Sequence, residues 1–348
     1  MRKVLFIMPS LQAGGAERVI AHLANGLINK QFKVTIALTR RNDIQYPLKP
    51  NVDVCFIGKR DLSPLRQIFF IRKMMKSDRE QTVISFLSMQ SLYTLIASFG
   101  LRNKVIVSVR NDPSKSLRSK PLIWLRNILY PHADKIVFQT EDARNYFKEN
   151  IRKNGVLIAN PLPDDIPSRN EGIREKRLVT VARLEKQKNI PMLLEVCRNI
   201  FEQYPDYHLE LYGVGELEAQ LKQYTKDIGI EAKVDFKGHQ ERIPEKIKTA
   251  TAFLLTSDYE GISNAMLEAL AVGLPCICTD CPVGGARMYI RPMENGILVP
   301  VGDVDGFTEA VMKVLGDEDL QNKLGREAAQ IVTELSLDKI LEQWIQII

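Results

Sequence analysis

The stretch VLFIMPSLQAGGAERVIAHLANGLINKQFKVTIALT, residues 4–39, carries the pattern on which the fold assignment rests. An apolar run, residues 4–9, is followed by the pair Gly14–Gly15 and then by apolar residues at helical spacing. Those residues are Val19, Leu23, Ala24 and Leu27. A second apolar run occupies residues 34–39. Strand, turn, amphipathic helix and strand in this order are typical of a parallel sheet covered by helices.

The same alternation continues along the chain and then restarts after a linker. Further runs of strand length are VISFL (83–87), VIVSV (105–109) and KIVFQT (135–140). Residues 161–176 are rich in proline and charge, which suits a linker. The second series is RLVTVARL (177–184), HLELYG (208–213), KVDFKG (233–238), AFLLTS (252–257) and PCICTD (275–280). We therefore predict two doubly wound α/β domains, 1–163 and 164–334, with a helix in 335–348 returning to the first domain. Ligands would bind at the carboxyl ends of the strands, in the cleft between two facing sheets.

Composition and apolar run lengths restrict the class of protein. The chain has 348 residues, of which 45% are hydrophobic and 26% charged, as in ordinary globular proteins. The most apolar stretch, residues 86–101, is interrupted by polar residues and does not reach the roughly 18 apolar residues of a spanning helix. The apolar run 4–8 is too short for a signal peptide and fits a buried first strand better. We expect a cytoplasmic protein that does not span a membrane.

Five cysteines, three of them clustered as Cys276, Cys278 and Cys281, raise the question of a metal site. Zinc takes four ligands, and the four histidines lie far away in the sequence. The alternating segment 275–280 fits a strand, in which free cysteine behaves as a small buried hydrophobe. We predict no metal, no cofactor and no disulfide framework.

The most specific pattern is SDYEGISNAMLEALAVGLPCICTD, residues 257–280. A helix that begins near Ser263 would carry Glu268 in its second turn and leave Glu260 in the preceding loop. The backbone N–H groups at its start are those of Ser263, Asn264 and Ala265, and they would face the site. Two carboxylates beside a phosphate-binding helix end suit a nucleotide-diphosphate sugar. On spacing alone, a surface acidic pair beside a helix start is the favoured explanation.

A basic pair and several glycines add to this pattern. Arg183 follows a predicted strand and Lys188 comes five residues later, and together they could neutralise a diphosphate leaving group. Gly14–Gly15 and Gly213-x-Gly215 follow strands without completing a dinucleotide fingerprint or a Walker loop. Such turns can still bring N–H groups close to a phosphate.

The combined motifs resemble glycosyltransferase family 4. The similarity lies in Gly-Gly-Ala-Glu at 14–17, R-L-x(3)-K-N at 183–189, Glu-Gly-x(6)-Glu-Ala at 260–269 and the following G-L-P. It covers essentially the whole chain. The segments DCPVGGARMYI and ENGILVPVGD look like bacterial members that build capsule, exopolysaccharide or O-antigen units. The resemblance implies the GT-B fold of two facing Rossmann-like domains and metal-independent transfer with retention of anomeric configuration.

The resemblance also implies roles for the matched residues. Arg183 and Lys188 would stabilise the departing nucleotide diphosphate, Glu260 would hold donor-sugar hydroxyls, and these three form the catalytic set. The donor-binding set comprises Gly14, Gly15, Gly213, Gly238, His239, Gly261, Ile262, Ser263, Asn264, Ala265 and Glu268. Within it, Glu268 would bind the ribose hydroxyls, and the Gly238–His239 loop would lie near the base.

One segment departs from the family pattern. Many relatives have a His-Asp pair after the fourth strand of the first domain, where this chain has Arg110–Asn111–Asp112. None of these side chains titrates near neutral pH as histidine does. Arg110 or Asn111 could bind a sugar hydroxyl or an acceptor phosphate, and Glu17 is placed in the same group. Alternatively, Asp112–Pro113 only shapes a turn.

Charge is divided unevenly along the chain. The net charge is +6, but residues 1–163 hold 27 Lys and Arg against 11 Asp and Glu, whereas residues 164–348 hold 21 against 31. Two segments of the first domain, 61–79 and 115–130, combine basic with apolar side chains. The basic ones are Arg66, Arg72, Lys73, Lys76, Lys115, Arg118, Lys120 and Arg126, and the apolar ones are Leu65, Phe69, Phe70, Met74 and Trp124. We expect peripheral docking on an anionic membrane surface, on the inner face of the cell membrane. The alternative for either segment is a core-facing stripe with a solvated basic face. Nucleic acid is disfavoured as a partner because no nucleic-acid-binding motif accompanies the charge.

These features together predict a retaining glycosyltransferase. It would move a hexose or N-acetylhexosamine from a UDP-sugar to a saccharide acceptor linked to a lipid pyrophosphate. A UDP-sugar 2-epimerase of the same fold is the alternative enzyme, although Arg110–Asn111–Asp112 and His239 are poor acid–base candidates. A non-catalytic nucleotide-sugar-binding protein is the other alternative. The triplet Asp303-Val304-Asp305 could suggest a metal-dependent enzyme, but its position before a helix fits an N-cap.

Overall fold

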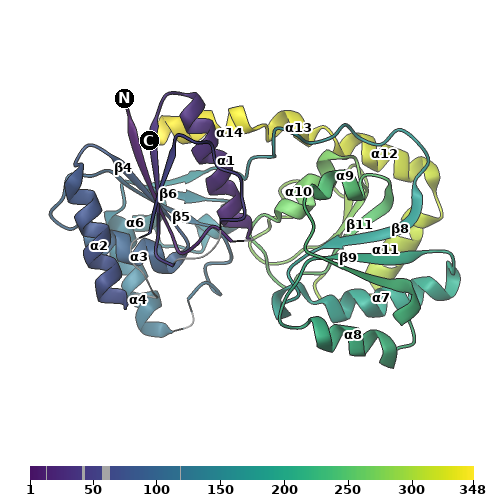
Figure 1. Ribbon diagram of the computed structural model, residues 1–348. Coiled ribbons are helices and arrows are strands. Elements are labelled where there is room, and N and C mark those ends of the chain that lie inside the picture. The colour runs from purple at the N-terminus through teal and green to yellow at the C-terminus, as the bar shows by residue number, and fades with distance from the viewer. Residues whose placement is uncertain (13, 41–43, 57–62, 118) are drawn as a thin grey trace. The chain divides into compact units, whose positions relative to one another are not determined.

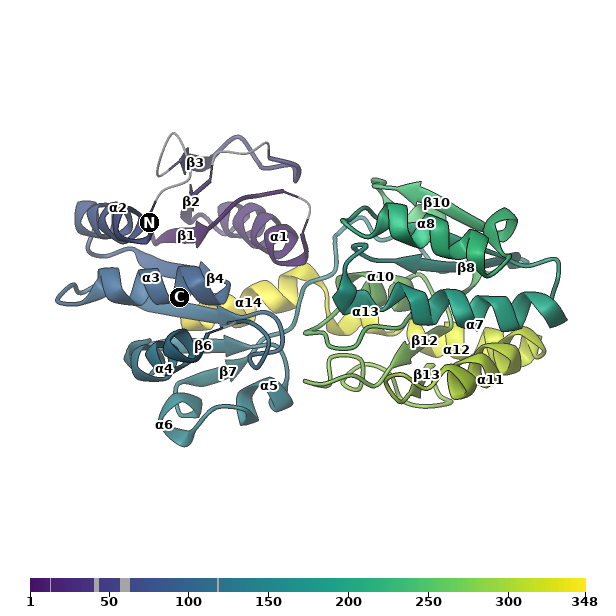
Figure 2. The same ribbon diagram turned by 90° about the horizontal axis from the view of Figure 1, so that it is seen from below.

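The computed structural model describes residues 1–12, 14–40, 44–56, 63–117 and 119–348, and they form two compact units. Met1–Pro163 together with Leu335–Ile348 make the first unit, and Asp164–Glu334 make the second. Each unit is a parallel sheet covered by helices (Figures 1 and 2). The predicted class, two doubly wound α/β domains, is therefore confirmed.

The sheet of the first unit has the strand order β3-β2-β1-β4-β5-β6-β7 among the described residues. The register places Phe6 of β1 opposite Ile36 of β2 and Ile84 of β4, so β1 lies in the middle of the sheet. The strands are β1 (Lys3–Met8), β2 (Lys33–Leu38), β3 (Val52–Phe56), β4 (Thr82–Phe86), β5 (Val105–Val109), β6 (Lys135–Phe138) and β7 (Gly155–Leu157). β1 is almost wholly buried, as a central parallel strand must be.

Helices cover both faces of this sheet. The predicted stripe of α1 (Gly15–Asn29) is buried, and α1 packs beside α14 (Leu337–Ile347). On the other face α2 (Pro64–Ser77) and α4 (Lys120–Leu129) both pack against α3 (Ser88–Ser98) (Figure 1). The short helices α5 (Glu141–Asn145) and α6 (Glu149–Arg152) complete the unit. Within the described ranges, every helix of the chain is too short or too polar to traverse a bilayer.

The last helix is held firmly in the first unit. The ring of Trp344 is fully buried and stacks on Phe86 of β4, with ring centroids 5.7 Å apart. The hydroxyl of Thr82 donates to the carbonyl of Ile348 at 3.0 Å, and the N–H of Leu162 donates to the carbonyl of Leu335 at 2.8 Å. The segment 335–348, expected to return to the first domain, thus packs against β4 of that unit.

The sheet of the second unit has the order β10-β9-β8-β11-β12-β13. Its strands are β8 (Glu175–Val181), β9 (His208–Tyr212), β10 (Val234–Gly238), β11 (Ala250–Leu255), β12 (Cys276–Thr279) and β13 (Gly296–Val299). The helices are α7 (Ile190–Gln203), α8 (Glu218–Asp227), α9 (Ile243–Ile247), α10 (Asn264–Ala271), α11 (Val304–Leu315), α12 (Glu318–Ala328) and α13 (Ile331–Glu334). α7 packs against both α8 and α11, whereas α9, α12 and α13 gather around α10.

The cysteines and the Asp-x-Asp triplet have structural positions. Cys276 and Cys278 lie in β12 and are fully buried, and burial raises the pKa of both thiols. The five cysteines are free thiols. The carboxylate of Asp303 accepts a hydrogen bond from the N–H of Gly306 at 2.8 Å and caps α11, as its sequence position indicates.

Some boundaries differ from the sequence-based prediction. β3, β7 and β13 were not predicted, because each is a short strand of three to five residues without a long apolar run. Since β3 precedes β4, the segment Arg110–Asn111–Asp112 follows the fifth strand and not the fourth. The strand predicted at 177–184 ends at Val181, which leaves Arg183 in a loop.

Candidate active site

A buried ion pair lies near the carboxyl ends of β8 and β11 in the second unit. The ammonium of Lys188 donates to Oε1 of Glu260, and the two side chains are only 10% and 13% exposed. The amide of Gln187 donates to the other oxygen of Glu260 and, at 2.8 Å, to the carbonyl of Tyr259. The structure thus brings together two of the three predicted catalytic side chains, and Glu260 accepts from two donors at once.

Asn189 explains why these two segments stay together. It has φ = +45°, a left-handed conformation that asparagine tolerates better than most residues. Its side-chain oxygen caps α7 by accepting from the N–H of Met192, and its amide nitrogen donates to Asp258 at 2.8 Å. The N–H of Asp258 donates to the carbonyl of Gln187 at 2.9 Å. The turn that carries Lys188 is therefore bound to the loop that carries Glu260.

Arg183, the third predicted catalytic residue, is placed differently. Its guanidinium is 57% exposed and pairs with Glu185 at 2.9 Å. An exposed pair of this kind contributes little to stability, so the side chain can exchange Glu185 for an anionic ligand at small cost.

The helix that follows Glu260 begins where the sequence predicts. Ser263 is the N-cap of α10, and its hydroxyl accepts a hydrogen bond from the N–H of Met266 at 3.3 Å. Asn264 and Ala265 form the start of the helix, and Glu268 lies buried in its second turn. Gly261 and Ile262 connect Glu260 to this cap. The N-terminal, electropositive end of α10 therefore follows Glu260, the partner of Lys188, after only a few residues of the sequence.

This loop also requires a glycine, Gly285, that was not among the predicted site residues. A Cβ atom on Gly285 would lie 1.6 Å from the carbonyl oxygen of Gly261, so the loop after β12 packs backbone against backbone on the Glu260–Ser263 segment. The pair Gly284–Gly285 in the sequence was the available signal, because adjacent glycines after a strand often mark a close backbone approach.

The other predicted glycines of this unit lie at strand ends. Gly213 has φ = +134°, and a Cβ there would lie 1.9 Å from the carbonyl oxygen of Ala182. Its N–H donates to the carbonyl of Gly238 at 2.8 Å, and Gly238 itself has φ = +64°. His239 is exposed beside Gly238. The ends of β8 and β9 thus approach each other at a distance that only glycine permits at position 213, whereas Gly238 supplies a positive φ at the end of β10.

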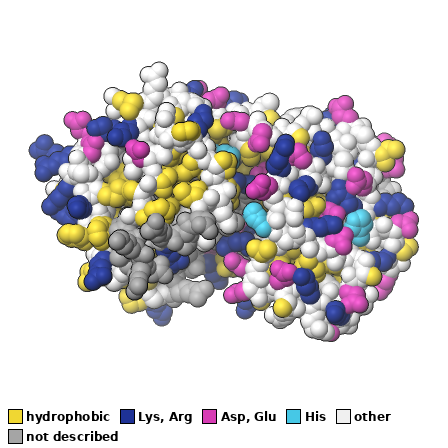
Figure 3. Space-filling model, in the orientation of Figure 1, with side chains coloured by type: hydrophobic (Ala, Val, Ile, Leu, Met, Phe, Trp, Pro, Cys, Tyr) yellow, Lys and Arg dark blue, Asp and Glu magenta, His cyan; other side chains and the backbone are white. Residues whose placement is uncertain are grey.

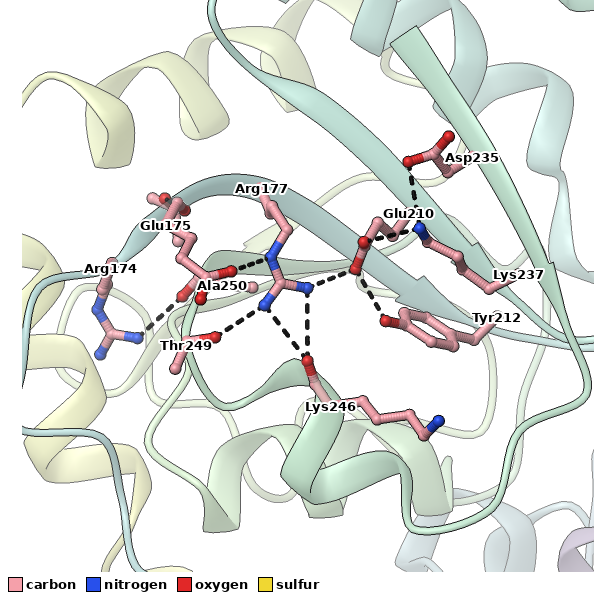
Figure 4. A network of polar contacts seen from close by, with 11 residues as sticks. Arg174, Glu175, Arg177, Glu210, Tyr212, Asp235, Lys237, Lys246, Thr249 and Ala250 are labelled. Carbon is pink, nitrogen blue, oxygen red and sulfur yellow. Dashed lines mark hydrogen bonds and ion pairs between the residues drawn. The ribbon is translucent and has the colours of Figure 1, made fainter.

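A network of charged groups holds these three strands in register (Figure 4). The buried carboxylate of Glu210 on β9 accepts hydrogen bonds from Arg177 of β8, from Lys237 of β10 at 3.1 Å and from Tyr212 at 2.8 Å. Burial alone would raise the pKa of Glu210, but the bonds from Tyr212, Lys237 and Arg177 outweigh it and hold the pKa below its ordinary value. Because Lys237 directly precedes Gly238, the network fixes the position of the Gly238–His239 loop.

The same region contains three potential metal ligands. Donor atoms of His208, Glu210 and Asp235 lie within 4.8 Å of one another. Lys237 pairs with both carboxylates, with Asp235 at 3.2 Å, and Arg177 pairs with Glu210. These bonds already supply positive charge to the carboxylates, which opposes the binding of a cation.

In the first unit the predicted glycines lie at the start of α1, at the end of the loop that follows β1. The N–H of Gly14 donates to the hydroxyl of Tyr46, and that hydroxyl donates back to the carbonyl of Gly14, both at 3.0 Å. The carboxylate of Glu17 folds over Gly14 and lies 2.1 Å from the point where a Cβ on Gly14 would be. Gly15 is the first helical residue. No sequence signal pointed to Tyr46, which anchors this loop from 32 residues away.

Arg110 lies on the same sheet, at the carboxyl end of β5. Its guanidinium donates to Oδ1 of Asn160, which also accepts from the amide of Gln139 at 2.7 Å. Its Cζ atom lies 4.8 Å from the ring centroid of Phe86. Burial lowers the pKa of this guanidinium to about 9.

The two residues after Arg110 form hydrogen bonds with turn backbone. The side-chain oxygen of Asn111 accepts from the N–H of Asp112, and the carboxylate of Asp112 accepts from the N–H of Ser114, both at 2.8 Å. Asp112 is buried. These contacts are those of a turn-shaping Asx motif. Of the three residues, Arg110 is therefore the one whose side chain reaches across the edge of the sheet, to Asn160.

Two parallel-sheet units with charged and glycine-rich loops after their strands define the GT-B class of glycosyltransferases, and solved structures share this architecture. TarM from S. aureus, solved with UDP, is 12% identical with a TM-score of 0.85, over 100% of this chain and 99% of that one. HepE from Anabaena, also solved with UDP, is 17% identical with a TM-score of 0.83, over 99% of each chain. At these identities the likeness shows the fold alone.

Family models identify both halves of the sequence. Residues 13–165 match the model described as Glycosyltransferase Family 4, and residues 163–331 match the model described as Glycosyl transferases group 1. The chain is thus a glycosyltransferase with a Family 4 domain followed by a group 1 domain, and the two matches together span residues 13–331.

The curated relatives include bacterial glycosyltransferases. One from Campylobacter jejuni is 27% identical over 100% of this chain and 98% of its own length. It is named GalNAc-alpha-(1->4)-GalNAc-alpha-(1->3)-diNAcBac-PP-undecaprenol alpha-1,4-N-acetyl-D-galactosaminyltransferase. The amylovoran biosynthesis glycosyltransferase AmsD of Erwinia amylovora is 25% identical over the full length of both chains. The protein is thus a glycosyltransferase, and its relatives include one named for bacterial polysaccharide biosynthesis and two named for acceptors linked to undecaprenol through a diphosphate.

Proposed function

We propose that this protein transfers a hexose or N-acetylhexosamine from a UDP-sugar to a saccharide acceptor carried on a lipid pyrophosphate, with retention of anomeric configuration. The observation that carries the proposal is the buried Lys188–Glu260 pair beside the start of α10, with the exposed Arg183 in the loop after β8. Cations for a diphosphate, an acceptor for sugar hydroxyls and a helix N-terminus are thus present in one unit.

Each side chain keeps capacity for a substrate. Lys188 has three N–H donors, and Glu260 takes one of them. Each oxygen of Glu260 accepts one hydrogen bond, which leaves lone pairs for sugar hydroxyls. Arg183 offers a planar fork of donors to the diphosphate.

These groups would act mainly on the leaving group. In the proposed step the bond between the anomeric carbon and the diphosphate oxygen breaks, and its electron pair stays with the diphosphate. The acceptor hydroxyl bonds to the same face of the sugar, and its proton passes to the departing phosphate oxygen. The negative charge that develops on the departing oxygen would be stabilised by Arg183, Lys188 and the start of α10. Electrostatic stabilisation of this kind is the largest catalytic contribution in many enzymes.

Two kinds of observation support the remaining parts of the proposal. The C. jejuni relatives are named for undecaprenol-linked diphosphate acceptors and for N-acetylgalactosamine transfer. TarM and HepE were solved with UDP.

An exposed surface on the first unit suits docking on anionic lipid. Leu65 and Phe69 of α2 are 79% and 65% exposed, and Trp124 of α4 is 66% exposed. The exposed basic side chains of the same helices are Arg66, Lys73, Lys76 and Lys120. Figure 3 shows Lys and Arg beside hydrophobic side chains over α2. The exposure of large apolar groups favours docking over a core-facing stripe.

Two basic residues assigned to this surface have other roles. The guanidinium of Arg126 is buried, donates to the carbonyl of Pro113 at 2.7 Å and stacks on the ring of Phe147. Arg72 donates to the carbonyls of Ala97 and Phe99, both at 2.7 Å, and so caps α3. Arg118 and residues 61–62 lie outside the described residues.

A product assay with two arms tests the function. The protein is incubated with UDP-sugars, with and without a saccharide linked to a lipid pyrophosphate. Transfer in the presence of acceptor, with the anomeric configuration retained by NMR, supports the proposal. A 2-epimer formed without acceptor supports the epimerase instead, and donor binding without any product supports a binding protein.

Vesicle co-sedimentation tests the docking surface. Binding to vesicles containing phosphatidylglycerol should fall with salt and should be lost in the double variant F69S/W124S. The matched control is I173S, which removes a 95% exposed apolar side chain of the second unit and should bind as the wild type does. Equal binding by both variants would remove α2 and α4 from the docking surface.

A further inference from the structure

We propose that Arg110 is the centre of an anion site at the carboxyl end of β5, and that this site binds a phosphoryl group of a substrate of the proposed transfer. The inference rests on the proposed function for the identity of that substrate. The ligand chemistry is a phosphate oxyanion, which either the donor diphosphate or the acceptor pyrophosphate could supply.

The site is built from neutral side chains around one cation. Asn160, Gln139 and Ser108 are each at most 3% exposed. Asn160 and Ser108 accept from the guanidinium, the latter at 3.4 Å, and Gln139 holds the Asn160 oxygen in place. The ring of Phe86 lies against the guanidinium, and Trp344 stacks on Phe86. The cation is therefore held in one position by β4, β5 and the segments after β6 and β7.

The charge of Arg110 has no compensating carboxylate in the part of the chain that the structure describes. Its hydrogen bonds go to an amide and a hydroxyl, and Nε is buried without a hydrogen-bond partner. The carboxylate closest in sequence, Asp112, is directed to the N–H of Ser114. Arg110 is half-buried, and a charge withdrawn from water is costly unless it is paired. The lowering of its pKa by burial alone agrees with the missing partner.

A purely structural role would not need a cation. The bonds to Asn160 and Ser108 need N–H donors, which a neutral amide also has without the desolvation of a charge. Arg126 of this unit, which is buried, is satisfied differently, since it donates to a backbone carbonyl and contacts two aromatic rings. Arg110 keeps N–H donors in a fixed fork, which matches the geometry of a phosphate.

The test compares Arg110→Gln with the wild type in binding and in kinetics. Probes are UDP, inorganic pyrophosphate and farnesyl pyrophosphate, titrated by calorimetry into the full chain. We expect Arg110→Gln to weaken the binding of at least one probe about ten- to hundredfold, the effect of losing a charge-assisted contact. Because the lost charge has no partner in the folded protein, the melting temperature should stay the same or rise.

The control is Arg72→Gln, which removes a guanidinium that bonds two helix carbonyls in the same unit. It should lower the melting temperature and leave the affinity for the probes unchanged. If Arg110→Gln instead behaves like this control, Arg110 is structural and the inference is wrong.

The kinetic arm identifies the source of the phosphoryl group. A rise in KM for the UDP-sugar assigns the site to the donor, and a rise in KM for the lipid pyrophosphate saccharide assigns it to the acceptor. Unchanged KM values and unchanged probe affinities overturn the inference while the transferase function stands. Conversely, Arg110-dependent pyrophosphate binding without any sugar transfer leaves the anion site standing and refutes the function.

Discussion

Breaking the Lys188–Glu260 pair from one side should destabilise the second unit. Lys188→Met leaves the carboxylate of Glu260 buried with only Gln187 as donor, and Glu260→Gln leaves the ammonium of Lys188 without a charged partner. Removing one partner of a fully buried pair costs about 3–5 kcal/mol. Because the side chains retain 10% and 13% exposure, and because Gln187 still bonds Glu260, we expect about 2–3 kcal/mol for each single variant.

The double variant K188M/E260Q should recover most of this loss. It contains no unpaired charge, so its destabilisation should be smaller than the sum of the two singles by about 2 kcal/mol or more. In a unit of this size each single variant should lower the melting temperature by about 4–12 °C. As a comparison, the exposed pair Glu218–Lys222 on α8 should show a coupling of at most about 0.5 kcal/mol.

Two probes separate the units in this experiment. Trp124 and Trp344 both lie in the first unit, so tryptophan fluorescence follows that unit, while calorimetry follows both. The calorimetric transition of the second unit should move, and the fluorescence transition should stay in place. Additive losses in the double variant would refute the assignment of a stabilising buried pair.

Three further outcomes are expected. Arg183→Ala should lower transfer about ten- to hundredfold with an unchanged melting temperature, whereas Arg326→Ala, which removes another exposed arginine paired with a nearby glutamate, should leave transfer unchanged. The pKa of Glu210 is lowered in the folded state, so the contribution of its carboxylate to stability is present above about pH 4.5 and is lost as the pH falls further. The difference in melting temperature between the wild type and Glu210→Gln should therefore shrink on acidification. A constant difference would contradict this. Trp344→Ala should destabilise the first unit by about 3–5 kcal/mol, measured by urea unfolding, because it leaves a large cavity against Phe86.

Much of the fold was predictable because it depends on local patterns. Long apolar runs gave the central strands, and the Ser263 cap gave the start of α10 to the residue. Edge strands such as β3 and β7 were not predicted, because a strand that is half exposed and only three to five residues long has no distinctive periodicity.

The candidate site was predictable only in its residue types. The motif spacing predicted Lys188 and Glu260 as site residues. Their ion pair, however, depends on the left-handed turn at Asn189, which no periodicity of the sequence indicates. The environment of Arg110 was equally hidden. Asn160 is 50 residues away in the sequence, and only the parallel order of β5, β6 and β7 brings it to the same edge.

The position of α14 also has a consequence for synthesis. Trp344 covers Phe86, yet the chain makes residues 335–348 only after the whole of Asp164–Glu334. On the ribosome, β1 to β7 are therefore complete while one apolar face of their sheet is covered by α1 but still lacks α14 and the ring that covers Phe86. The uncovered part of that face is exposed to chaperones and to other nascent chains for as long as the second unit takes to be translated, so the first unit completes its fold only after the second unit has been made.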